Sequence, residues 1–289
     1  MWSPLLVEVF FVPATITWYH TMALKDDFRG MLPEEVAKRI PDGFQVIGDI
    51  AVISLPPELH EFRHLVAGAI ISRHRNVRIV AAREQIPRGD LRVANLEVIL
   101  GVDSTTTLYR EYGFCYRLDV EVTFFSARLA SERRRVWMQV RSGEEVLVPF
   151  AGVGPFAIPP ASRGALVTAI EKNPLACGFL RENVSLNRVV ARVFVHEGDV
   201  EEVLPEISAE FDRAIVPAPY GHDQALFSIL PMVKEGGAIH FYTFKKASQV
   251  PAIQNEYEGV GLEVYAIRRC GYVGPGVARY AFDMVKRRR

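Results

Sequence analysis

Cysteine is scarce in this chain of 289 residues, where it occurs only at Cys115, Cys177 and Cys270. No two of the three have the CxxC spacing of a metal or redox motif, which excludes a disulfide-rich secreted fold. We interpret them as reduced thiols of a cytoplasmic protein that pack as small hydrophobic side chains. No His, Cys and carboxylate set has metal-ligand spacing either, so the sequence predicts no metal site.

Net charge and long apolar runs are also missing. The chain has 34 Lys plus Arg against 34 Asp plus Glu, which argues against a uniformly cationic nucleic-acid coat protein but permits a local basic patch. The apolar opening, residues 1–22, lacks a preceding basic region and contains Pro4 and Pro13. Its roughly 16 apolar-leaning residues are fewer than the roughly 20 that span a bilayer. We expect no membrane anchor, and Met22 is an alternative start that would make residues 1–21 an upstream extension.

Apolar residues are abundant, at 49% of the chain, which is enough for one large or two ordinary domains. From Phe44 the pattern predicts a strand, a helix that begins at the Pro-Pro-Glu sequence of residues 56–58, and four short strands separated by turns. We assign residues 44–123 to a small α+β domain and residues 1–43 to an N-terminal extension.

The second half of the chain alternates strands and helices after a connecting helix predicted over residues 126–140. Seven strands are predicted, at residues 144–151, 165–171, 191–199, 211–219, 236–244, 262–271 and 278–285. This alternation predicts a doubly wound sheet whose last strand returns antiparallel. We assign residues 124–289 to this domain.

A glycine-spaced turn follows the first of these seven strands. Gly152 and Gly154 allow a positive φ and let backbone N–H groups approach a ligand beside a helix N-terminus. Glu171, which ends the next strand 17 positions after Gly154, can accept hydrogen bonds from ribose hydroxyls, and Asp199 can hold an adenine amino group at the end of the third strand. The pattern indicates an adenosine-containing cofactor, although a lone GxG also occurs as a packing device.

The third glycine of the GxGxxG dinucleotide fingerprint is absent, because Phe156 and Ala157 follow Gly154. A pyrophosphate would be poorly held by such a turn. S-adenosylmethionine carries no phosphate and needs only one turn that favours a carboxylate, so it fits the pattern better.

Four segments of the second half together resemble one family: "FAGVGPFAIP", "EKNPLACGFLRENVSLNRV", "KEGGAIHFY" and "GYVGPGVARYAFDM". They are similar to archaeal and eukaryotic tRNA (guanine-37-N1)-methyltransferases and to the related wybutosine-pathway aminocarboxypropyltransferases, and the likeness runs from about Leu24 to the C-terminus. The resemblance implies a class I S-adenosylmethionine-dependent methyltransferase fold, Rossmann-like with a mostly parallel seven-stranded sheet, preceded by a small α+β domain that helps to hold tRNA.

The resemblance also implies roles for individual residues. The expected cofactor contacts are Phe150, Gly152, Gly154, Phe156, Glu171, Lys172, Asn173, Gly198, Asp199 and Pro219. Arg128 in "FFSARLASER" matches an arginine of the methyltransferase members, and its guanidinium suits the oxyanion that develops at O6 when guanine N1 loses its proton. The alternative for Arg128 is a surface ion pair with Glu132.

Catalysis also needs a base and a contact for the target nucleobase. The candidate bases are Asp199, His222 and Asp223, of which the last two also fit a solvated loop pair. Tyr220 can stack on a flipped base.

Two departures from the family pattern leave the activity open. Family members usually carry an Asp just before the glycine turn, where this chain has Val148 and Pro149. They also carry Asn-Leu-Pro or Asn-Pro-Pro after the fourth strand, but Pro217 takes the place of that Asn and has neither a side-chain amide nor an N–H to offer guanine. Aminocarboxypropyl transfer, or a tRNA- and cofactor-binding paralogue that has lost catalysis, therefore stand as alternatives.

Arginine dominates the charge of residues 61–140, which contain 13 Arg and no Lys against 9 Asp plus Glu. The arginines expected to contact tRNA phosphates are Arg73, Arg75, Arg78, Arg83, Arg88, Arg92 and Arg133 to Arg135. A solvated arginine-rich face is the alternative. We expect a monomer that binds the anticodon stem-loop, and we expect His240 at the edge of a core strand.

Overall fold

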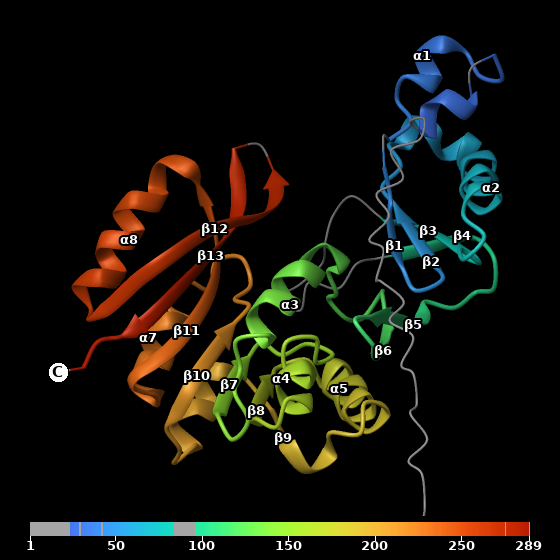
Figure 1. Cartoon of the computed structure of the whole chain (residues 1–289). Helices are drawn as coiled ribbons and strands as arrows, with labels where there is room; N and C mark the ends of the chain where they lie inside the picture. Colours follow the sequence, from blue (N-terminus) through green and yellow to red (C-terminus); the bar gives the residue numbers. More distant parts are fainter. Residues whose placement is uncertain (1–23, 29, 42, 84–95, 275, 289) are drawn as a thin grey trace, which may run out of the picture.

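The computed structural model describes residues 24–28, 30–41, 43–83, 96–274 and 276–288. The predictions for residues 1–21, Arg88 and Arg92 therefore lie outside the described residues. The chain forms a small N-terminal unit and a larger C-terminal unit, each built around its own sheet, with a short hairpin between them (Figure 1). In the part of the chain that the structure describes, no helix has the length and apolar composition needed to cross a membrane.

The N-terminal unit contains a four-stranded sheet in the order β1-β2-β3-β4. Its strands are β1 (Gln45–Ile47), β2 (Ile50–Ile53), β3 (Ile79–Arg83) and β4 (Leu96–Leu100). Its helical elements are η1 (Leu24–Phe28), α1 (Glu34–Ala37), η2 (Pro57–Phe62) and α2 (Arg63–Arg73). Strands β2 and β3 are parallel because η2 and α2 carry the chain back between them. The predicted helix is thus present, and its first six residues, Pro57–Phe62, form a 3-10 helix.

The residues before β1 pack into this unit. Leu24, Phe28 and Ile40 belong to the same buried cluster as Val66 and Ile70 of α2. Leu24, Phe28 and Ile40, which fall within the predicted extension, therefore share the core of the small unit. The boundary at residues 123 and 124 stays a prediction.

A hairpin of β5 (Thr106–Glu111) and β6 (Phe114–Asp119) connects the two units. On the side of the small unit, the Thr107 hydroxyl donates to Asp49 Oδ1 at 2.6 Å and accepts from the Asp49 N–H at 3.2 Å. Gly48 makes this approach possible, because a Cβ there would collide with the Thr107 hydroxyl.

On the side of the larger unit, two asparagines of α5 (Pro174–Leu186) and its C-cap bind the backbone of β6. Asn183 accepts from the Arg117 N–H at 2.6 Å and donates to the Arg117 carbonyl at 2.9 Å. Asn187 makes the same pair of bonds with Cys115, at 3.0 and 2.7 Å. Residues four apart on a helix rise about 6 Å. Residues two apart on a strand rise about 6.8 Å, so the two spacings match.

The segment that joins the hairpin to the larger sheet contains η3 (Ala127–Leu129) and α3 (Ala130–Trp137). Arg133 is buried and donates from two nitrogens to Glu111, and Arg135 donates to Asp283. The two guanidinium groups neutralise the buried carboxylates of Glu111 and Asp283, because a buried carboxylate without a partner would destabilise the fold. The prediction that Arg133 and Arg135 contact RNA phosphates is therefore wrong, and of the three neighbouring arginines only Arg134 is exposed.

The larger unit contains the predicted seven-stranded sheet, in the order β12-β13-β11-β10-β7-β8-β9. Its strands are β7 (Glu145–Pro149), β8 (Leu166–Glu171), β9 (Val193–Glu197), β10 (Phe211–Val216), β11 (Val233–Lys246), β12 (Leu262–Gly274) and β13 (Val277–Lys286). Strand β13 is antiparallel to both of its neighbours, as predicted for the last strand, and the other neighbouring pairs are parallel.

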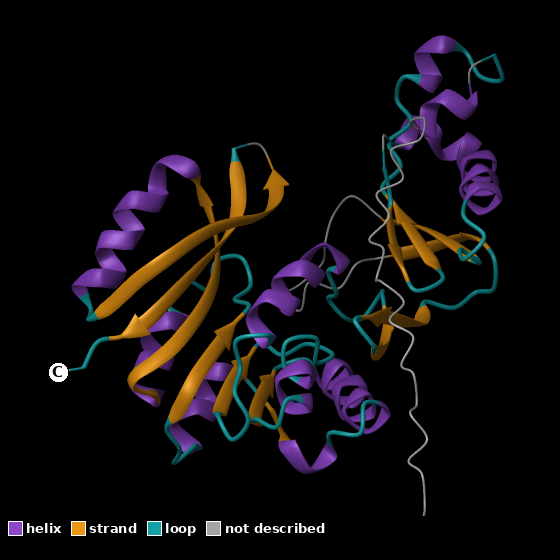
Figure 2. Ribbon diagram, viewed as in Figure 1, coloured by secondary structure: helices purple, strands orange, loops and turns teal. Residues whose placement is uncertain are grey.

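Helices cover both faces of this sheet (Figure 2). They are α4 (Ile158–Ser162), α5, α6 (Val200–Val203), α7 (Ala225–Ile229) and α8 (Val250–Gly259). The strand order reverses between β7 and β10, because the chain first adds β8 and β9 on one side of β7 and then returns to the other. In doubly wound sheets, ligands bind outside the carboxyl ends of the strands at such a point.

His240 lies inside the sheet on β11 and is fully buried, which corrects the prediction of a position at the edge of a core strand. Its Nδ1 lies 2.7 Å from Asp283 Oδ1 and its Nε2 lies 2.7 Å from an Arg213 nitrogen. Arginine can only donate, so Nε2 accepts and Nδ1 carries the proton. Burial lowers the pKa of His240 despite the neighbouring carboxylate. The imidazole is therefore a neutral link in a polar network.

Candidate cofactor and substrate site

A cavity of about 570 Å³ opens beyond the carboxyl ends of β7, β8 and β10, at the point where the strand order reverses. Nine of the predicted site residues line it: Phe150, Gly152, Phe156, Glu171, Lys172, Asn173, Asp199, Pro219 and Tyr220. Gly154, Gly198 and Arg128 are not among the lining residues. The volume falls within the range of about 300–1,000 Å³ that is usual for small-molecule sites.

The two glycines of the turn after β7 have different surroundings. Both have positive φ, 55° at Gly152 and 99° at Gly154. A Cβ on Gly152 would meet only the Phe124 carbonyl, at 3.7 Å, whereas a Cβ on Gly154 would lie 2.6 Å from Leu180 and 2.9 Å from Ile158. Gly152 therefore opens toward the cavity, and Gly154 allows α4 and α5 to pack against the turn.

Gly198 has a packing role of the same kind. It precedes α6, and a Cβ there would lie 2.8 Å from the Val203 side chain. Its close approach to α6 explains why this glycine stands outside the cavity wall.

Glu171 joins the glycine turn to the end of β8. Its Oε2 accepts the Gly152 N–H at 2.7 Å and its Oε1 accepts the Asn173 N–H at 2.8 Å. Burial raises the pKa of Glu171, and the N–H groups of Asn173 and Gly152 lower it only in part. A carboxylate has about four acceptor positions, and the N–H groups of Gly152, Asn173 and Lys172 leave part of this capacity for a ligand in the cavity.

Asn173 fixes the wall opposite the turn. Its side-chain oxygen accepts from the Leu175 N–H at 3.0 Å and thereby caps α5, while its amide nitrogen donates to the Val122 carbonyl at 2.8 Å. The segment after Val122 contributes Phe124, Phe125 and Ser126 to the cavity. Asn173 thus positions that wall through its side chain.

Asp199 and Lys172 form an ion pair at the mouth of the cavity. Asp199 caps α6 through the Glu201 N–H at 3.0 Å and accepts from Lys172 Nζ at 2.9 Å. The hydrogen bond from Lys172 lowers the pKa of the Asp199 carboxyl. Asp199 is therefore a weak base at neutral pH.

The opposite side of the cavity is aromatic. Tyr220 is 60% exposed, and the centroid of its ring lies 5.6 Å from that of Phe244. The Arg279 guanidinium lies over the Phe244 ring, 4.6 Å from its centroid. His222 lines the same cavity and makes an edge contact with Phe150 at 5.6 Å.

Arg128 is exposed on η3, and its neighbours Ser126 and Leu129 line the cavity. The alternative ion pair with Glu132 is not formed, because Glu132 accepts from Arg135 at 2.9 Å. Arg128 has no ion pair with any described residue, and its neighbours in the sequence line the cavity.

Two residues of the loop after β10 differ in their access to the cavity. Pro217 lines it, at the position where the resemblance led us to expect an asparagine. Asp223 does not line it, because its carboxylate accepts from Lys245 at 2.5 Å and from the Thr243 hydroxyl. Of the three candidate bases, Asp199 and His222 are therefore in the cavity and Asp223 is not.

Sequence reasoning missed several lining residues. Phe124 and Phe125 form an apolar pair just before η3, a local signal that could have been used. Tyr242 and Arg279 carry no local signal, since only the pairing of β11 with β13 brings them to the cavity.

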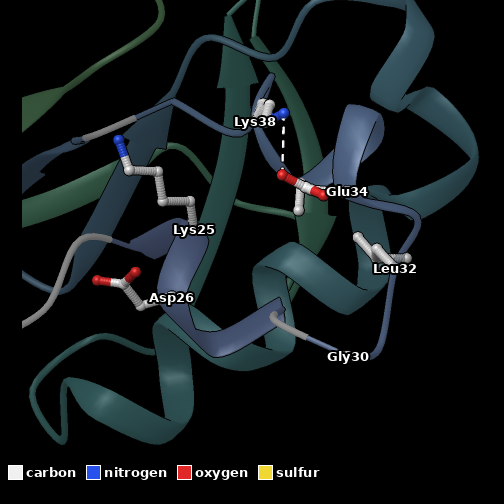
Figure 3. A pocket seen from close by; sticks show the side chains of 7 residues that line it. Lys25, Asp26, Gly30, Leu32, Glu34 and Lys38 are labelled. Atoms are coloured by element: carbon white, nitrogen blue, oxygen red, sulfur yellow. Dashed lines mark ion pairs between the residues drawn. The ribbon is translucent and has the colours of Figure 1, made fainter.

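A second hollow, of about 610 Å³, lies in the small unit (Figure 3). Its lining includes Lys25, Asp26, Glu34 and Lys38, and the exposed Lys38 pairs with Glu34 at 3.0 Å. Charges of both signs are mixed there, and no aromatic side chain of the described residues lines it. The cavity of the larger unit is therefore the candidate site.

The sheet order, the antiparallel β13 and the glycine turn with Glu171 define the predicted class I methyltransferase fold. The family model described as TRM5/TYW2 methyltransferase domain matches residues 107–257, and the one described as TYW2 N-terminal domain matches residues 24–105. The chain belongs to the TRM5/TYW2 methyltransferase family.

Two relatives with different named activities are similar to this chain. The tRNA (guanine(37)-N(1))-methyltransferase Trm5b of Pyrococcus abyssi is 38% identical over 213 residues, which are 74% of this chain and 63% of that protein. The tRNA(Phe) (4-demethylwyosine(37)-C(7)) aminocarboxypropyltransferase of Pyrococcus horikoshii is 33% identical over 262 residues, 88% of this chain and 92% of that protein. The chain thus spans less than two thirds of the length of the first relative.

A solved structure extends the comparison to a complex. The complex of aTrm5 with tRNALeu has a TM-score of 0.81 and 26% identity, and the alignment covers 91% of this chain and 78% of that one. The two units of the chain therefore both have counterparts in a protein that was solved with tRNA.

Proposed function

We propose that this chain is an S-adenosylmethionine-dependent transferase that methylates N1 of guanosine 37 in tRNA. The observation that carries the proposal is the cavity at the strand-order reversal, where Gly152 and Glu171 are joined by a hydrogen bond of 2.7 Å. Family membership and the similarity to a relative named for this activity support it.

The cavity fits the cofactor better than it fits a dinucleotide. Glu171 keeps acceptor capacity that would hold a ribose hydroxyl, and the open side of Gly152 would accept the amino-acid end. Asp199 would hold the adenine amino group. These two carboxylates would repel a pyrophosphate. When bound, S-adenosylmethionine supplies an electrophilic methyl group.

The substrate side of the cavity would take the guanine base. Tyr220 offers an exposed side chain for stacking, and Arg128, which has no ion pair with any residue that the structure describes, would offer its guanidinium to O6. We assign proton acceptance from N1 to His222, because Lys172 already stabilises the ionised form of Asp199 and makes it a weaker base.

The test is nucleoside mass spectrometry after incubation of the full chain with S-adenosylmethionine and unmodified tRNA that carries guanosine 37. We expect a gain of one methyl group on guanosine, and no gain with tRNA that carries adenosine 37 or with the Glu171→Ala variant. Cofactor and tRNA binding without a modified nucleoside would instead identify a paralogue that has lost catalysis.

Aminocarboxypropyl transfer is a second candidate, favoured by two observations. The N-terminal unit matches the TYW2 N-terminal domain, and Pro217 lines the cavity where an asparagine is expected for methyl transfer. The same assay on tRNA that carries a wybutosine precursor separates the two candidates, since this activity would add an aminocarboxypropyl group.

The setting of the protein is part of the proposal. We propose a cytoplasmic monomer that engages the anticodon stem-loop without a metal ion. Light scattering on the purified chain, with and without tRNA, tests the monomeric state.

A further inference from the structure

The residues that line the cavity come from two sides of the strand order. Glu171 and Asp199 follow β8 and β9 on one side, whereas Arg279 lies on β13 toward the other. Neighbouring strands are about 4.8 Å apart, so β13, which is separated from β7 by β11 and β10, lies about 14 Å from the strand that precedes the glycine turn. Arg279 therefore belongs to the side of the cavity that the proposed function gives to the substrate.

Charge divides the cavity in the same way. Both carboxylates among the described lining residues, Glu171 and Asp199, are on the cofactor side. Of the cationic lining residues, Lys172 pairs with Asp199, and Arg133 is held in a buried ion pair. Arg279 is the third cationic lining residue and lies on the substrate side. An anionic group that enters the cavity is thus repelled from the cofactor side and attracted to Arg279.

An aromatic ring holds the Arg279 side chain at this place. Arg279 is half-buried and pairs across the sheet with Phe244, and its guanidinium lies 4.6 Å from the centroid of the Phe244 ring. Tyr220, from the loop after β10, contacts the same ring at 5.6 Å between centroids. Contact with a ring face orients a guanidinium and permits N–H bonds in its plane to an anion. Phe244 is thus the common neighbour of the exposed Tyr220 and of Arg279.

We propose that Arg279 binds a phosphate group that flanks the nucleotide whose base enters the cavity. The base would stack on Tyr220, and one of its two neighbouring phosphates would reach the guanidinium beyond Phe244. The guanidinium fork matches the geometry of phosphate oxygens. The proposal rests on the proposed tRNA substrate. The carboxylate of the cofactor is also an anion, but the proposed function places it at Gly152, so the RNA phosphate is favoured.

The first test uses the full chain and an anticodon stem-loop RNA. We expect Arg279→Gln to raise KM for this RNA about tenfold or more, as expected for the loss of a charged hydrogen bond. The slope of log affinity against log salt should fall by about 0.7, the value for one single-stranded phosphate contact. Cofactor affinity, measured by titration calorimetry, should not change. Arg279→Lys should raise KM less and keep the slope, because it retains the charge but loses the planar contact.

Arg269→Gln is the matched control. Arg269 is an exposed arginine of the same hairpin, and it pairs with Tyr280, the residue after Arg279. Successive residues of a strand point to opposite faces, so Arg269 lies on the face opposite to Arg279. This variant should leave KM, the salt slope and cofactor affinity unchanged.

A second measurement leaves the protein intact. The two phosphates that flank the target nucleotide are replaced, one at a time, by an uncharged methylphosphonate. One replacement should weaken binding to the wild-type chain about tenfold but should not weaken binding to Arg279→Gln further. Equal losses in both proteins would overturn this inference.

The remaining outcomes separate this inference from the proposed function. If Arg279→Gln lost cofactor affinity and kept the salt slope, Arg279 would bind the carboxylate of the cofactor, and this inference alone would be wrong. If the wild-type chain modified the RNA and Arg279→Gln had the same KM and salt slope, the result would be the same. A wild-type chain that neither binds nor modifies the RNA overturns the proposed function and this inference with it.

Discussion

Gly152 and Gly154 lie two residues apart in one turn, yet they face different parts of the molecule. Both need a positive φ, which costs other residues about 1–2 kcal/mol. They differ in what a side chain would meet, because Gly154 is in contact with Leu180 and Ile158 and Gly152 borders the cavity. The same substitution at the two positions should therefore affect different properties.

We expect Gly154→Ala to lower the free energy of unfolding by about 2–4 kcal/mol, from overpacking added to backbone strain. Gly152→Ala should cost only the strain, about 1–2 kcal/mol, but should weaken S-adenosylmethionine binding. Urea denaturation measures the first effect and titration calorimetry the second. Equal losses of stability, or unchanged cofactor affinity in Gly152→Ala, would contradict the division of roles.

The sequence predicted this turn and its partner Glu171 because both are local signals at the ends of strands. It did not separate the glycine that borders the cavity from the one that permits packing, since that depends on Leu180, which is far from the turn in sequence. Tyr242 and Arg279 were missed for the same reason.

At the scale of elements, Asn183 and Asn187 let a helix bind the edge of a hairpin as a neighbouring strand would. Asn183 is fully buried and also donates to the Val153 carbonyl at 2.9 Å, within the glycine turn. One side chain thus satisfies three backbone groups, two on β6 and one in the glycine turn.

We expect Asn183→Ala to destabilise the protein by about 3 kcal/mol or more, because three buried backbone groups lose their partner. Asn187→Ala should cost less, about 1–2 kcal/mol, because Asn187 is only half-buried and water can replace its amide. Urea denaturation of the two variants provides the comparison. A smaller loss for Asn183→Ala than for Asn187→Ala would show that the amide of Asn183 is dispensable.

The buried network around His240 predicts a dependence of stability on pH. Burial lowers the pKa of His240 below its ordinary value of 6.5, so below that pH the unfolded chain binds a proton that the folded chain does not. Stability should therefore fall as the pH drops from 7.5 to 5.5, with a slope of at most about 1.4 kcal/mol per pH unit from this group.

Chemical denaturation at pH 5.5, 6.5 and 7.5 measures this slope. His240→Asn should flatten it, and the control His196→Asn should leave it unchanged because His196 is exposed. If the free energy of unfolding changed with pH equally in the wild type and in His240→Asn, the pH dependence would arise from groups other than His240.

The alternation of strand and helix patterns predicted the elements of the larger unit, because the spacing of apolar residues that marks each element lies within that element's own sequence. The position of His240 was mistaken because its neighbours come from β10 and β13, and strand order does not follow from periodicity.

At the scale of the whole molecule, the arginine-rich stretch divides into internal and external charges. Arg133 and Arg135 form ion pairs with buried carboxylates, whereas Arg75 and Arg78 are exposed on the small unit. Composition could predict the excess of arginine but not which arginines face inward, because the partners Glu111 and Asp283 come from distant strands.

We expect the double variant Arg75→Ala and Arg78→Ala to bind tRNA more weakly and to lower the slope of log affinity against log salt by about 1 for each lost phosphate contact. Cofactor affinity should not change. Arg141→Ala is the control. Arg141 is exposed just before β7, at the amino-terminal end of that strand, whereas the cavity lies beyond the carboxyl ends of the strands. If the slope of log affinity against log salt fell equally in the double variant and in Arg141→Ala, the small unit would have no specific phosphate-binding role.

The β5–β6 hairpin touches the small unit at Asp49 and the glycine turn through Asn183. A movement of one unit relative to the other would therefore be transmitted through the β5–β6 hairpin and Asn183 to the carbonyl of Val153. Contact of the small unit with a large substrate and binding of a small donor in the cavity are thus coupled through the hairpin. Loss of the hydrogen bonds at either end of the hairpin should weaken this coupling.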